Sequence, residues 1–116
     1  MENFINLLDG TRLEATFNFG TIYYLEECGG SKLAERIQQK KEQGIEPTSF
    51  ENMKLASKII YAILRSNGKK VTVDEAMSLV GADNTEIENI MKIFESELEK
   101  YKKKETAKQS MTKTFR

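Results

Sequence analysis

The sequence predicts a mainly α-helical α+β fold, in which an N-terminal β-hairpin precedes about five helices packed around a central apolar helix. Two patterns predict this fold. After an Asp9-Gly10 turn, polar and apolar side chains alternate from residue 12 to 19, as expected of a half-buried strand, so residues 3–19 are predicted to form a hairpin. From residue 49 to 66, apolar side chains recur every three or four positions and cover more than half of a helix circumference. A helix this apolar must be covered on several sides, so we place it at the centre.

The ends of the central helix are encoded locally. Thr48 and Glu51 have the spacing of a capping box, in which each side chain binds a backbone N–H that the first turn leaves unpaired. Asn67-Gly68 is a left-handed stop signal at the other end. A narrow polar stripe on this helix is expected to face water; it consists of Lys54, Ser57, Lys58 and Arg65.

The register of the hairpin is open at this point. A two-residue turn would pair Leu8 with Thr11, and a three-residue loop with a glycine bulge would pair Leu7 with Thr11. The first arrangement places Phe4 and Leu8 on the Leu13 face, and the second places Ile5 and Leu7 there. The strand edges carry little Pro or Lys, so they leave room for strand pairing between subunits.

The remaining helices are expected at about residues 22–28, 32–43, 73–80 and 84–103. Gly29-Gly30 ends the first of them, and Ser31 is a candidate N-cap for the second. Thr72 with Glu75, and Asp83 with Glu86, have capping-box spacing before the last two. We therefore expect one domain over residues 1–104, followed by a flexible basic tail over residues 105–116.

Composition excludes the commonest active sites. The 116 residues include no histidine and one cysteine, Cys28, so neither a Cys-His pair nor a Ser-His-acid triad can form. Zinc-ligand spacing and a phosphate-binding glycine loop are also missing. We expect no enzyme activity, no metal and no cofactor. A lone cysteine and the lack of an apolar span fit a cytoplasmic location away from membranes.

Charge and aromatic residues indicate where a partner would bind. The chain is neutral overall, but residues 100–116 carry a net charge of +6 and the rest carries −6. Tyr23 and Tyr24 are adjacent on a predicted helix, so one of them should lie at a rim, where Tyr is favoured in interfaces. The first strand is apolar on both faces. The candidate partner or oligomer contacts are Phe4, Ile5, Tyr23, Tyr24, Lys102, Lys103 and Lys104.

Three segments together resemble a known family. They are Leu13 to Thr21 (LEATFNFGT), Ile59 to Leu64 (IIYAIL) and Val71 to Ala76 (VTVDEA) with the following Leu79-Val80. The chain resembles the tail assembly chaperones of long-tailed phages and prophages of Gram-positive bacteria over about residues 3–104. The resemblance implies a non-enzymatic, oligomeric protein of the host cytoplasm that is absent from the mature virion. It would bind the tape measure protein, keep it soluble and help to recruit tail tube protein.

The alternative is a small nucleic-acid-binding regulator. It would use the basic C-terminal tail, or the helices at 73–80 and 84–103 as a helix-turn-helix pair. Asp83, Glu86 and Glu88 crowd the start of the second helix, where a recognition helix would meet phosphates. Nucleic-acid binding is therefore the less favoured function.

Overall fold

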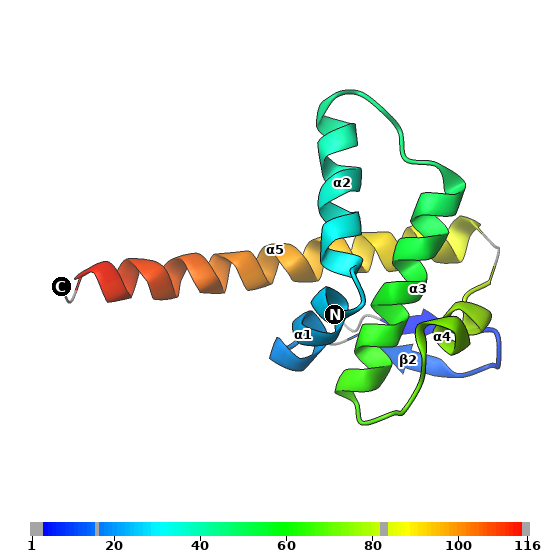
Figure 1. The fold of residues 1–116 in the computed structure, drawn as a ribbon. Coiled ribbons are helices and arrows are strands. Elements are labelled where there is room, and N and C mark those ends of the chain that lie inside the picture. The colour runs from blue at the N-terminus through cyan, green and yellow to red at the C-terminus, as the bar shows by residue number, and fades with distance from the viewer. Residues whose placement is uncertain (1–3, 16, 82–83, 115–116) are drawn as a thin grey trace.

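The hairpin leads into helices that surround α3 (Figure 1), and the predicted mainly helical α+β fold is confirmed. A computed structural model describes residues 4–15, 17–81 and 84–114, with side chains up to residue 100 except that of Asn84. Within these residues the elements are β1 (Phe4–Asn6), β2 (Arg12–Glu14), α1 (Phe19–Glu27), α2 (Gly30–Glu42), α3 (Ser49–Ser66), α4 (Val73–Leu79) and α5 (Asn84–Thr114).

Helix α3 has the predicted bounds because its caps form as the sequence indicates. The Thr48 hydroxyl accepts the Glu51 N–H at 3.1 Å, and the Glu51 carboxylate accepts the Thr48 N–H at 3.0 Å. Gly68 follows the helix with φ +85°. The polar stripe is narrower than predicted, because Ser57 is fully buried and its hydroxyl donates to the Met53 carbonyl at 2.9 Å. Helix α3 is therefore covered almost all round.

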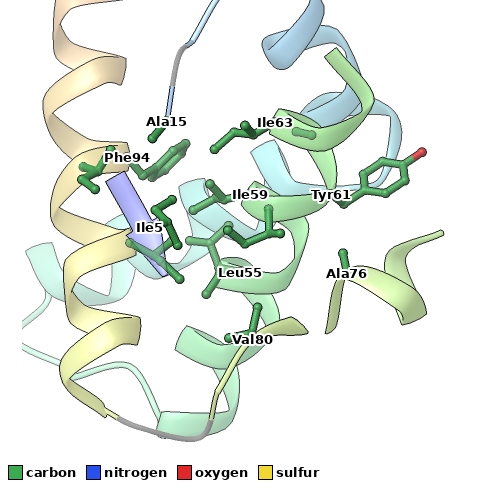
Figure 2. Close-up of a cluster of buried hydrophobic side chains, with 14 of the residues drawn as sticks. Ile5, Ala15, Leu55, Ile59, Tyr61, Ile63, Ala76, Val80 and Phe94 are labelled. Atoms are coloured by element: carbon green, nitrogen blue, oxygen red, sulfur yellow. The ribbon is translucent and has the colours of Figure 1, made fainter. Parts of the chain in front are cut away.

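The core surrounds α3 and is closed by α1, α2, α4, α5 and the hairpin. In Figure 2, Ile5 and Ala15 from the hairpin segment approach Ile59 of α3 and Phe94 of α5. Ile60 and Ile63 of α3 have no exposed surface. Their burial makes α3 the scaffold on which the other elements are placed.

The structure selects the hairpin register with the three-residue loop. Ile5 lies opposite Leu13, and the Leu7 N–H donates to the Thr11 carbonyl at 2.9 Å. Gly10 has φ +89°, as a glycine bulge requires. Ile5, Leu7 and Leu13 consequently face the core. The exposed Leu8 sits at the tip of the loop.

The outer edge of β1 is closed, which differs from the expectation of unguarded edges. The Asn6 N–H donates to the Glu86 carboxylate at 3.0 Å, and the Asn89 amide donates to the Phe4 carbonyl at 3.3 Å. Beyond the strand, the Leu8 N–H donates to the Leu79 carbonyl at 2.9 Å. Side chains of α5 thus occupy the backbone groups that another strand would need.

Helices α1 and α2 begin earlier than predicted. The second strand was expected to run on to Phe19, but it ends at Glu14. Asn18 and Thr21 form a capping box that starts α1 at Phe19. Helix α2 begins at Gly30, directly after Gly29 with φ +81°, so Ser31 lies inside the helix and is not its N-cap. The tight Gly29-Gly30 corner therefore joins the two helices without a longer loop.

Helix α5 continues to Thr114, past the predicted end at Lys103, and carries the chain away from the body (Figure 1). Residues 101–114 contain neither Gly nor Pro, so nothing in that sequence terminates a helix. A flexible tail had been expected from residue 105. The proposed cap residue Asp83 lies outside the described residues, whereas Glu86 binds β1 as described above.

Candidate functional site

An apolar groove opens between α2 and α5, with α1 and α3 beneath it. Its volume is about 600 Å³. The apolar side chains that line it are Ile22, Leu25, Ala34, Ile37, Leu55, Met91, Phe94 and Leu98. Polar and charged side chains of α2 and α5 form its rim: Ser31, Glu35, Gln38, Gln39, Lys41, Glu42 and Glu95. The groove therefore combines an apolar floor with a solvated border.

The groove exists because α2 has a narrow apolar face. Leu33 and Ile37 are buried against the body, but the next position towards α5 is the small, half-buried Ala34. Helix α5 presents a wider apolar face, and its Met91 and Leu98 are only half-buried. Since α2 offers too few large side chains to fill the space, apolar surface of α5 remains open towards it.

The groove follows most of the length of α2. Its lining begins at Ser31 and ends at Glu42, which corresponds to about 17 Å along a helix at 1.5 Å per residue. On α5 the lining extends from Met91 to Leu98, about two turns. Figure 1 shows α2 running across α5 rather than along it, so a helix laid against α5 in this groove has about two turns of contact.

The rim has an acidic bias. Glu35 and Glu42 project from α2, and Glu95 projects from α5. Lys41 is the basic residue of the lining, and its ammonium forms an ion pair with Glu95 at 3.2 Å. Both partners are largely exposed, so this pair contributes little to stability. It links α2 to α5 across the groove, and it can open without a large cost.

Further large apolar side chains are exposed outside the groove. Phe19 and Tyr23 lie one helical turn apart on α1, with about three fifths of each exposed. Leu8 and Met77 lie on the hairpin loop and α4, and Ile45 and Phe50 lie near the start of α3. They are spread over α1, the hairpin loop, α4 and the start of α3, so the groove is the stronger candidate site.

The two predicted tyrosine contacts pack edge-to-face on each other, with ring centroids 5.1 Å apart, but they differ in exposure. Tyr24 is half-buried and packs edge-to-face on Tyr61, with ring centroids 6.3 Å apart, and the Arg65 guanidinium lies over its ring. Tyr23 is exposed, and its hydrogen bond to the Glu27 carboxylate raises the pKa of the Tyr23 hydroxyl. Tyr23 is therefore the tyrosine of this pair that is open to solvent, and its contact with a partner stays a prediction.

The other predicted contacts have different positions. Ile5 is completely buried, because its strand faces the core in the selected register, so it offers no surface to a partner. Phe4 is half-buried on the outer face of the hairpin, where the Arg12 guanidinium lies 4.2 Å from its ring centroid. Lys102, Lys103 and Lys104 belong to α5, and their side chains lie outside the described part of the chain.

The cysteine has a packing role. Cys28 is half-buried, its thiol donates to the Leu25 carbonyl at 3.3 Å, and burial raises the pKa of the thiol. A raised pKa keeps the thiol protonated and lowers its reactivity. Among the residues whose placement is described, no three His, Cys, Asp or Glu side chains are arranged to hold a metal ion. In the same part of the chain, no helix combines the length and apolarity needed to cross a membrane.

In the sequence, Ala34 and Ile37 have the spacing of one helix face, and so have Met91, Phe94 and Leu98. That spacing does not show that the two faces meet. The sequence signal that could have indicated the groove is the difference between the narrow apolar face of α2 and the wide apolar face of α5. Comparison of the chain with protein-family models, curated proteins and solved structures gave no match.

Proposed function

We propose that this protein is a non-enzymatic tail assembly chaperone that binds helical segments of a tape measure protein in the groove between α2 and α5. Binding would cover apolar stripes that otherwise drive the tape measure protein to aggregate. Recruitment of tail tube protein, homo-oligomer formation and action in the host cytoplasm, outside the mature virion, follow from the family resemblance. The apolar groove is the observation that carries the proposal.

The shape of the groove suits a helix better than a small polar ligand. An amphipathic helix docks through side chains at positions i, i+3 or i+4 and i+7, which occupy about two turns. The floor offers matching apolar contacts from Ala34 on one side and Met91 and Leu98 on the other. Because these three residues are half-buried, docking removes further apolar surface from water without unfolding the domain.

The charge of the groove rim indicates which kind of helix would bind. The rim is mainly acidic, and residues 1–99 carry a net charge of −6. A helix whose apolar stripe is flanked by Lys or Arg would place those side chains next to Glu35, Glu42 and Glu95. Such complementarity speeds association and disfavours acidic helices. The proposed ligand is therefore a basic amphipathic helix.

The experiment is co-expression with the tape measure protein encoded in the same gene cluster. The variant Ala34→Glu places a carboxylate on the apolar floor, where it has no partner once a helix is docked. Ser96→Glu is the matched control, because it adds the same group at an exposed position of α5 outside the groove. Circular dichroism of both variants checks that the fold is retained.

The proposal expects the wild-type chain and Ser96→Glu to co-purify with the tape measure protein and to raise its soluble yield. It expects Ala34→Glu to lower the amount captured by about tenfold or more. If a folded Ala34→Glu variant captures as much as the control, the groove is not the binding site. If the wild-type chain neither co-purifies with the tape measure protein nor improves its solubility, the proposed function is wrong.

A further inference from the structure

We propose that the free edge of β2 pairs with β2 of a second copy of this chain, in an antiparallel arrangement centred on Leu13. The two hairpins would form one four-stranded sheet across a two-fold axis. This interface is separate from the groove, and it assigns a specific contact to the homo-oligomer of the proposed function. It rests on the backbone geometry of the hairpin and on the charges of Arg12 and Glu14.

The register determines which backbone groups of β2 are free. The Leu7 N–H binds the Thr11 carbonyl, so Leu7–Thr11 and Ile5–Leu13 are the hydrogen-bonded pairs of the hairpin. The backbone groups of Arg12 and Glu14 therefore point away from β1. Within the described part of the chain, no hydrogen bond to these outward groups is present. Both residues are exposed.

Among the described residues, the outer edge of β2 is open in this way and that of β1 is closed. Figure 1 shows β1 lying between β2 and α5, and Glu86 and Asn89 of α5 bind the outer backbone groups of β1. A sheet with two open edges can add strands indefinitely, whereas a sheet with one open edge closes after a single pairing. The expected product is a dimer rather than a fibre.

The charges of β2 fit a second copy of the same strand. Antiparallel pairing centred on Leu13 sets Arg12 opposite Glu14 of the other copy, and Glu14 opposite its Arg12. Each of these two pairs would exchange two backbone hydrogen bonds, because both residues point their backbone groups outward. Opposite charges placed directly across strands stabilise pairing, and like charges oppose it. The strand is therefore complementary to itself in one register.

The test is sedimentation velocity with Arg12→Glu, Glu14→Arg, their equimolar mixture and the double variant. Because the shared edge is short, we expect the wild-type dimer to have a dissociation constant on the order of 100 µM. Samples should therefore reach about 1 mM. Each single variant brings like charges together at both pairs, so it should raise the dissociation constant of the dimer by about tenfold or more. The mixture and the double variant restore opposite charges, so their dissociation constants should lie within about threefold of the wild-type value.

Three outcomes would contradict pairing through β2. A wild-type chain that stays monomeric at about 1 mM would overturn it. So would single variants that dimerise as well as wild type, or a mixture and double variant that remain as weak as the singles. Thermal melts of all variants control for folding, since Arg12 also lies over Phe4. Ala34→Glu should dimerise like wild type, so failure of the groove proposal and failure of this one can be told apart.

Discussion

The carboxylate of Glu86 accepts the backbone N–H of Asn6 at 3.0 Å, which joins the C-terminal helix α5 to the first strand. Three residues further along α5, the Asn89 amide donates to the Phe4 carbonyl. These contacts satisfy the outer edge of β1 with side chains rather than with another strand. The same helix thus supplies one wall of the groove and closes one edge of the sheet.

Replacing Glu86 by alanine should lower the free energy of unfolding by about 1 kcal/mol, because the Asn6 N–H loses its acceptor. Glu86→Gln should retain most of the stability, since its amide oxygen can still accept the bond. Urea denaturation of the two variants measures the difference. Equal stabilities for Glu86→Ala and wild type would show that the contact contributes nothing.

The ion pair at the start of α3 predicts a dependence of stability on pH. The Lys40 ammonium, 2.7 Å from the Glu51 carboxylate, and the Thr48 N–H lower the pKa of Glu51 to about 2. The ordinary pKa of a glutamate is 4.5, so the unfolded chain binds more protons between these two values, and stability should fall as the pH drops through this window.

Lys40→Met should raise the pKa of Glu51 in a carbon-detected NMR titration. The stability difference between wild type and Lys40→Met should be present near neutral pH and should shrink as the pH falls towards 2. Lys54→Met, at an exposed position on α3, is the control and should leave the Glu51 titration unchanged. A Glu51 pKa that does not respond to Lys40→Met would contradict this account of the cap.

Gly30 should not tolerate alanine, although alanine normally stabilises a helix. A Cβ at this position would lie 2.4 Å from Leu25 Cδ1 and 3.0 Å from the Leu25 carbonyl oxygen. We expect Gly30→Ala to cost about 1–3 kcal/mol in chemical denaturation, because the Gly29-Gly30 corner has no space for a methyl group. In a Leu25→Ala background the same change should cost less. An equal cost in both backgrounds would exclude the clash as the cause.

A polar side chain in the middle of α3 should unfold the domain. Ile60 and Ile63 have no exposed surface, so Ile60→Asn or Ile63→Asn removes apolar burial and leaves an amide without partners. The expected loss is about 4 kcal/mol or more, a large part of the stability of a domain this size. Ile60→Val is the control and should cost about 1 kcal/mol. A folded Ile63→Asn monomer that had lost only partner binding would contradict the scaffold role of α3.

The elements that were predicted well are those whose ends are determined by neighbouring residues in the sequence. The bounds of α3 followed from the Thr48–Glu51 box and Gly68, because those residues satisfy the helix ends by themselves. The end of β2 was wrong because two signals compete. Alternating polarity continues to Phe19, but Asn18 and Thr21 cap a helix and that local hydrogen bonding prevails.

Tertiary features were less accessible from the sequence. The register of the hairpin depended on whether Leu7 or Leu8 faces the core, and packing on α3 decides that. The closure of β1 depends on Glu86, whose spacing from Asp83 had indicated only a helix cap. The groove arises because Ala34 is small where α2 approaches α5. Each of these requires knowing which elements meet in space, and the pattern of a single element does not contain that information.

The most direct test of the central claim is methyl NMR of this chain during titration with a helical segment of the tape measure protein. Ala34, Met91 and Leu98 carry methyl groups in the groove, and Leu8 and Met77 provide exposed reference methyls elsewhere. The groove account predicts that the first three signals shift with a common dissociation constant while the reference signals do not. Shifts confined to Leu8 and Met77, or no shifts at all, would contradict it.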